Sequence, residues 1–180
     1  IEQPKGLGFH AYDLIGSDQK NRDIHSSLSS LKLDKTVEKF ANVSSQISKR
    51  NVLLWKWCRY LNERLTLSCV APQHTTILND IKTIDLIFMT LLDDIVDEKK
   101  NGMMFKEAKK IIALRSHASF SNVSEEERYF LEMCREMWCH VYEKMRLFPR
   151  YQEFADIFFY DYNQLINSFE YSLLVNAKTN

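Results

Sequence analysis

The segment DLIFMTLLDDIVDE, residues 85–98, places four acidic side chains directly after a nearly unbroken apolar run. Its length and apolar spacing predict the last turns of a helix that begins near His74. On such a helix Asp93 and Asp97 lie one turn apart on the same face, and Asp94 lies about 100° away from Asp93. Like charges at this spacing repel each other, and the C-terminal end of a helix disfavours them further. The pattern therefore predicts a compensating cation at this helix end.

A divalent metal ion would supply that positive charge. Mg²⁺ in proteins is held through one or two carboxylates, several waters and the oxygens of a substrate phosphate. Leu86, Met89 and Thr90 precede Asp93 on the same stripe of the helix, so the carboxylates stand at the rim of an apolar surface. The alternative interpretation is a solvated helix end, followed by two lysines.

The rest of the chain, from about residue 34, has apolar residues at helical spacing. The predicted helices span about residues 34–48, 51–69, 74–98, 105–115, 124–148 and 149–176. Pro72 and Asn101-Gly102 indicate helix ends, and Ser124 with Glu127 has the spacing of a capping box. On four of these helices the apolar residues that recur every three or four positions share one face and are the core candidates. They are Val37, Phe40, Val43 and Ile47 in the first helix; Leu54, Trp57, Cys58, Leu61 and Leu65 in the second; Leu131, Cys134, Trp138, Val141, Met145 and Phe148 in the fifth; and Phe154, Phe158, Leu165 and Phe169 in the last. These patterns predict an all-α bundle.

The composition agrees with this fold class. The 180 residues include 4 Gly and 3 Pro, so the turn-forming residues that a sandwich, a barrel or a Gly-rich nucleotide-binding fold requires are scarce. Three of the four glycines and a serine cluster fall within residues 1–30. We predict an irregular N-terminal segment at residues 1–30 and one helical domain at residues 31–180.

The charge and the cysteines exclude several functions and point to a compartment. The 24 basic and 24 acidic residues balance, which argues against binding to nucleic acid. No run of eighteen apolar residues occurs, which argues against a membrane span. The four cysteines have neither zinc-site spacing nor a dense disulfide pattern, and we predict reduced thiols in the core of a cytoplasmic protein.

The sequence Asp93-Asp94-Ile-Val-Asp97 in this setting resembles the D-D-x-x-D motif of class I terpenoid synthases, an all-α family. The resemblance implies a Mg²⁺-dependent terpene cyclase that ionises a linear isoprenyl diphosphate and closes the carbocation in an apolar pocket. It implies that Asp93 and Asp97 are metal ligands that take part in catalysis. Asp94 would be a weaker ligand or a neighbour of the ligands, and Leu86, Met89 and Thr90 would line the pocket.

The last predicted helix carries a polar stripe formed by Asp156, Tyr160, Asn163, Asn167 and Tyr171. The resemblance implies that a long helix in this region lines the cavity, which makes Tyr160, Asn163 and Asn167 candidate pocket residues. A solvated helix face is the alternative. The candidate aromatic side chains for the pocket, each of which could equally belong to the core, are Trp55, Trp57, Phe88, Trp138 and Tyr160.

The second metal motif of the family, N-D-x-x-S-x-x-x-E, does not occur after Asp97, and residues 163–170 resemble it only with the wrong spacing. The expectation is therefore that the chain corresponds to roughly the first two thirds of such a fold, either cut short or completed by a further C-terminal polypeptide. A homodimer is the alternative expectation for its partner. On its own the chain would then be inactive.

Three alternatives to a cyclase remain open. Prenyl diphosphate synthases share the aspartate-rich motif, but their first motif leads within a few residues to a pair of arginines, whereas the first arginine after Asp97 here is Arg115. Squalene- and phytoene-type prenyltransferases also carry aspartates on helices around a cavity. A non-catalytic helical interaction module would explain the absence of the second motif.

Overall fold

The structure, a computed structural model, describes residues 26–178, and every regular element in that range is helical. The prediction of an all-α fold is confirmed for this part of the chain. Its elements are α2 (Lys35–Ser48), α3 (Val52–Leu65), α4 (Pro72–Asp97), α5 (Gly102–Leu114), the short 3₁₀ helix η2 (Arg115–His117), α6 (Glu125–Met145) and α7 (Tyr151–Lys178). The chain divides into two compact units, Ile1–Lys32 and Leu33–Asn180.

In the first unit, residues 26–30 are helical, although the sequence predicts an irregular segment through residue 30. The serine cluster that suggested a loop fits the helical turn, because the Ser30 hydroxyl donates a hydrogen bond to the Ser27 carbonyl oxygen at 2.8 Å. Serine near a helix end satisfies backbone groups in this way. The rest of the predicted segment, residues 1–25, lies outside the described residues.

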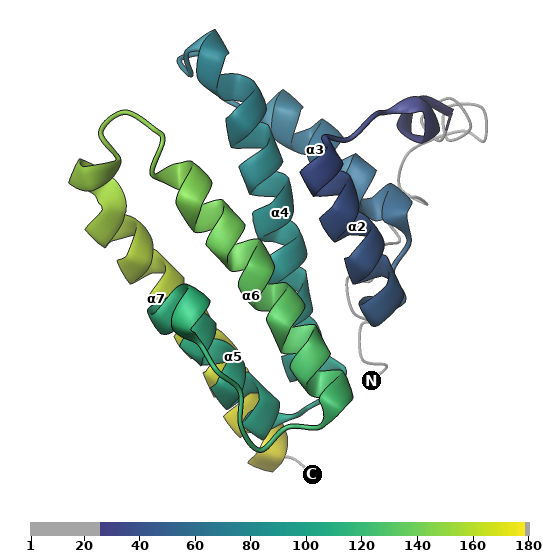
Figure 1. The fold of residues 1–180 in the computed structure, drawn as a ribbon, viewed down its shortest axis with the longest axis vertical. Helices are drawn as coiled ribbons and strands as arrows, with labels where there is room; N and C mark the ends of the chain where they lie inside the picture. Colours follow the sequence, from purple (N-terminus) through teal and green to yellow (C-terminus); the bar gives the residue numbers. More distant parts are fainter. Residues whose placement is uncertain (1–25, 179–180) are drawn as a thin grey trace, which may run out of the picture. The chain divides into compact units, whose positions relative to one another are not determined.

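Helix α4 is the centre of the second unit (Figure 1). It contacts α2, α3, α5, α6 and α7, and Figure 1 shows it between α2 and α3 on one side and α6 on the other. The apolar run within residues 84–96 is buried on most sides as a result. Its fully or nearly fully buried apolar members are Ile84, Ile87, Phe88, Leu91, Leu92, Ile95 and Val96. A helix with apolar residues in nearly every direction requires such a central position.

Two predicted helix boundaries are wrong for identifiable reasons. Helix α3 ends at Leu65 rather than near Cys69, and Thr66 takes up an extended conformation there. Helix α5 begins at Gly102, because the Asn101 side chain accepts a hydrogen bond from the Met104 amide at 3.0 Å. Asn101 is therefore the cap of the following helix instead of a stop signal for the preceding one. The predicted capping box of Ser124 and Glu127 at the start of α6 is confirmed.

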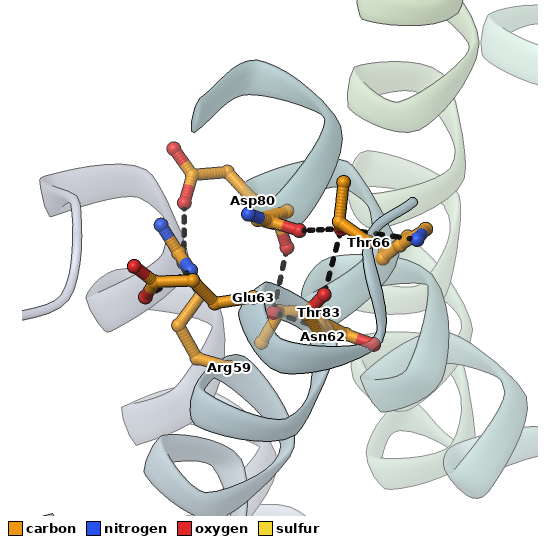
Figure 2. A network of polar contacts seen from close by, with 8 residues as sticks. Arg59, Asn62, Glu63, Thr66, Asp80 and Thr83 are labelled. Carbon is orange, nitrogen blue, oxygen red and sulfur yellow. Dashed lines mark hydrogen bonds and ion pairs between the residues drawn. The ribbon is translucent and has the colours of Figure 1, made fainter. Parts of the chain in front are cut away.

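A buried polar network joins α3 to α4 (Figure 2). The Asn62 side-chain amide donates to the Thr83 hydroxyl at 3.1 Å, and Thr83 in turn donates to the Asn79 carbonyl oxygen at 2.8 Å. The Thr66 hydroxyl lies 2.6 Å from the Asn79 side-chain oxygen. The Arg59 guanidinium forms an ion pair with the Asp80 carboxylate of α4 at 2.9 Å. These contacts fix the register of α3 against α4.

We expect Thr83→Val to lower the free energy of unfolding by about 1–3 kcal/mol, the usual cost of leaving a buried polar group unpaired. Valine keeps the shape of threonine but removes the oxygen that accepts the Asn62 amide, and both residues are buried. Urea unfolding followed by circular dichroism measures the change. Thr90→Val is the matched control on the same helix, because the Thr90 hydroxyl bonds only to its own helix, at Leu86. Equal losses for both variants would contradict the role of the network.

The predicted core residues are confirmed on most helices and wrong at four positions. Phe40, Leu54, Leu131, Cys134, Trp138 and Val141 are buried. By contrast Leu65 is 70% exposed, Phe154 51% and Leu165 41%, and Cys69 is also exposed. All four cysteines have free thiols. Within the described range, no helix combines the length and apolarity that crossing a membrane requires.

Candidate functional site

The aspartate-rich motif occupies the last turn of α4, where backbone carbonyl oxygens accept hydrogen bonds from the amides that follow the helix. The amides of Glu98 and Lys99 both donate to the Asp94 carbonyl oxygen, at 3.1 and 2.9 Å, and the Asn101 amide donates to the Ile95 carbonyl oxygen at 3.2 Å. These bonds close the helix end without help from the acidic side chains. The carboxylates of the motif are therefore available for other partners.

Asp94 differs from the other two aspartates of the motif because it is buried and paired with an arginine. It is 5% exposed, and its carboxylate forms an ion pair with the guanidinium of Arg50, which lies between α2 and α3. Both residues line a cavity of about 410 Å³ next to Glu98 and Lys99. Asp94 would have to leave Arg50 to reach a metal ion bound by its neighbours, so its predicted role as a ligand has no support from this arrangement.

Asp93 and Asp97 lie together on the open side of the helix end. Asp93 is partly exposed and Asp97 is exposed. Partial burial raises the pKa of Asp93, and the charges of Asp97 and Asp94 raise it further, while Arg50 lowers it. The repulsion expected from the sequence is therefore present at Asp93 and is only partly offset by the arginine.

Asp93 and Asp97 could serve as the two protein ligands of a magnesium ion whose other ligands are water and phosphate oxygens. Among the described residues, no three His, Cys, Asp or Glu side chains converge in a way that could hold a metal ion. Mg²⁺ requires only one or two carboxylates when waters and substrate phosphates complete its shell. Asp93 and Asp97 meet that lower requirement, whereas a site made entirely of protein ligands does not exist in this part of the chain.

The predicted pocket residues of α4 extend from the motif as a partly open apolar strip. Leu86 is 42% exposed, and Met89 and Thr90 are partly buried. The Thr90 hydroxyl donates to the Leu86 carbonyl oxygen at 2.8 Å, so its hydrogen is already used. The structure thus brings Leu86, Met89 and Thr90 to the same side of α4 as Asp93 and Asp97.

The predicted pocket residues of α7 do not line a cavity in this structure. Tyr160 is 63% exposed, and Asn163 and Asn167 are also exposed, as in the solvated face that the sequence left open. Among the candidate aromatic side chains, Trp55, Phe88 and Trp138 are buried in the core, and Trp57 is partly buried. None of these three core rings faces an open pocket.

Sequence patterns missed two polar contacts at the edges of α4. Arg50 is 44 residues from Asp94 in the sequence, and Tyr162 is 77 residues from Asp85, whose carboxylate accepts a hydrogen bond from the Tyr162 hydroxyl. Burial raises the pKa of Asp85 to about 6, and the Tyr162 hydrogen bond lowers it. The only available signal was that Asp85 interrupts an otherwise apolar segment, which predicts a partner but does not identify it.

The arrangement can therefore bind a cation at Asp93 and Asp97 and place an apolar group against the strip that begins at Leu86. Comparisons of the chain with protein-family models, with curated proteins and with solved structures found no match.

Proposed function

We propose that the chain is the part of a Mg²⁺-dependent class I terpene cyclase that carries the aspartate-rich motif. The observation that carries the proposal is the separation of the three aspartates. Arg50 neutralises Asp94, while Asp93 and Asp97 keep an uncompensated charge beside the apolar strip of Leu86 and Met89. A linear isoprenyl diphosphate has the two matching features, an anionic head that magnesium can bridge to carboxylates and an apolar tail.

In this proposal Asp93 and Asp97 would hold Mg²⁺ at the end of α4, and the ion would supply the positive charge that stabilises a diphosphate leaving group. The apolar strip receives the hydrocarbon chain and keeps water away from it. Thr90 contributes its methyl group rather than its hydroxyl, which is bonded to Leu86.

The exposed face of α7 supports the expectation that a second polypeptide or a second copy of the chain adjoins this site. We define this face as the exposed apolar side chains Phe154, Ile157, Tyr160, Leu165, Tyr171 and Leu174. Isolated apolar residues on a surface are ordinary, but six large ones on one helix offer apolar area to a partner, with the exposed Asn163 and Asn167 among them. The proposal keeps the cytoplasmic location expected from the free thiols.

The second candidate function is a non-catalytic helical interaction module. The same α7 face favours it, together with the lack of a three-ligand metal cluster in the described residues. The two functions differ in one measurable property, because only the cyclase requires binding of a diphosphate that depends on magnesium.

Isothermal titration with a non-hydrolysable farnesyl diphosphate analogue should give a binding heat that appears only when Mg²⁺ is present. Asp93→Asn and Asp97→Asn should each weaken this binding more than about tenfold, since each removes one metal ligand. The same substitutions in an assembled, active enzyme should lower turnover by about 10²-fold or more, as removal of a charge-stabilising group does.

The substitution Glu143→Gln is the control, because it removes one exposed charge at the C-terminal end of α6, whose neighbours on α4 are in the N-terminal half of that helix rather than at the motif. It should leave the magnesium-dependent heat unchanged. The absence of any metal-dependent heat in the unaltered chain would favour the interaction module instead.

A further inference from the structure

A second cavity, of about 350 Å³, lies between the N-terminal half of α4, the end of α6 and the start of α7. Its walls are almost entirely apolar, and the principal side chains that form them are Ile81, Val141, Met145, Phe148, Phe154 and Phe158. Clefts that bind small molecules in proteins start at about this volume, about 300 Å³, and have mostly apolar walls with a few polar groups.

The polar group that distinguishes this cavity is the carboxyl of Asp85. One of its oxygens accepts the Tyr162 hydroxyl, and no lysine, arginine or histidine of the described residues forms an ion pair with it. Lys82 also lines the cavity, but its ammonium group donates to the Thr66 hydroxyl at 3.3 Å, on the α3 side. Asp85 is therefore a partly buried acid without a positive partner.

We propose that this cavity binds a small lipophilic amine, held as its ammonium ion by the Asp85 carboxylate. A buried carboxylate is stabilised most by an opposite charge, and the ligand supplies the charge that the described residues do not. The rings of Tyr151, Phe154 and Phe158 line the same space and favour a cation over a neutral head group. The apolar walls then accommodate the alkyl or aryl part of the ligand.

The site is distinct from the aspartate-rich motif. Asp85 lies eight residues before Asp93, which corresponds to about 12 Å along a helix. It is also about 100° around the helix from Leu86, the first residue of the apolar strip, and faces α7 through Tyr162. Binding of an amine at this position needs neither a metal ion nor a diphosphate.

The test uses N,N-dimethylhexylamine as the probe and 1-hexanol as the neutral control of equal chain length. In a chain labelled with ¹³C at the methionine methyl groups, the Met145 signal reports the cavity, and the signal of Met103, 53% exposed on α5, is the internal reference. We expect the amine to shift the Met145 signal with an affinity at least about tenfold higher than the alcohol, the gain expected from one charge-assisted hydrogen bond.

Asp85→Asn should remove this preference for the amine. Phe154→Lys gives a second readout that spares the fold, because Phe154 is 51% exposed at the rim of the cavity and a lysine there would repel the ammonium group. Ile157→Lys introduces the same charge one turn away on α7, outside the cavity lining, and should leave amine binding unchanged. Asp93→Asn should also leave it unchanged, so this proposal and the cyclase proposal can fail independently.

The pH dependence gives a third readout. Burial raises the pKa of Asp85 to about 6, so the carboxylate becomes protonated and amine binding weakens as the pH falls through that value. The other titratable groups at the cavity are Lys82 from α4 and Tyr151 and Tyr162 from α7, and burial raises the pKa of both tyrosines. Equal affinities for amine and alcohol, or unchanged amine binding in Asp85→Asn and Phe154→Lys, would overturn the proposal.

Discussion

Trp138→Ala should lower the free energy of unfolding by about 3–5 kcal/mol, the range for removing a large buried aromatic side chain. Trp138 is fully buried in the second unit, and its ring lies 4.5 Å from the Tyr162 ring and 5.4 Å from the Phe88 ring, measured between centroids. It also stacks on Phe158 at 6.2 Å. One residue thus links α4, α6 and α7. Urea unfolding at 25 °C measures the loss.

Two controls separate ring packing from other effects. Trp138→Phe keeps an aromatic ring and removes an indole N–H that has no partner among the described residues, so its cost should be less than half that of alanine. Tyr171→Ala removes a ring that is 70% exposed on α7 and should change the free energy of unfolding by less than about 0.5 kcal/mol. A loss below about 1 kcal/mol for Trp138→Ala would show that the aromatic cluster is poorly packed.

The helices themselves could be predicted because their signals are local. The capping box of Ser124 and Glu127 and the apolar spacing of α2 and α6 depend on residues three or four positions apart. The helix boundary at Asn101 was predicted wrongly because this residue has two possible local roles. Asn101 can follow one helix or cap the next, and only the position of the Met104 amide decides between them.

The exposed face of α7 shows the limit of periodicity. Phe154 and Leu165 occur at spacings that suit a buried stripe, yet the packing of α7 against α4, α5 and α6 leaves both side chains exposed. Periodicity predicts that a helix has an apolar face, but the number of neighbours that cover it is a property of the whole assembly. The sequence therefore overestimated the buried part of this helix.

The candidate site was predictable only as a cluster of charges. The spacing of Asp93 and Asp97 predicts their common face, and the structure places them together on the open side of α4. The different role of Asp94 depends on Arg50, which no local pattern connects to the motif. Contacts between residues far apart in the sequence decide which of three similar carboxylates remains available for a cation.

Arg50→Ala should lower the free energy of unfolding by about 3 kcal/mol or more, the cost of leaving one partner of a buried ion pair uncompensated. The side chain of Asp94 is 7% exposed and that of Arg50 is 29% exposed, so water would not readily replace the guanidinium. The loss would also add repulsion at Asp93, since the charge of Arg50 lowers the pKa of that carboxyl. Urea unfolding at neutral pH measures the change.

Lys39→Ala provides the matched control, because Lys39 pairs with Glu136 while both side chains are largely exposed, 51% and 44%. Exposed pairs contribute about 0–1 kcal/mol, so this variant should remain close to the unaltered chain. The double substitution Arg50→Met with Asp94→Leu removes both charges together and should recover most of the lost stability. If Arg50→Ala and Lys39→Ala cost the same, the Asp94 carboxylate must be solvated, and all three aspartates of the motif would then be equally open to a metal ion.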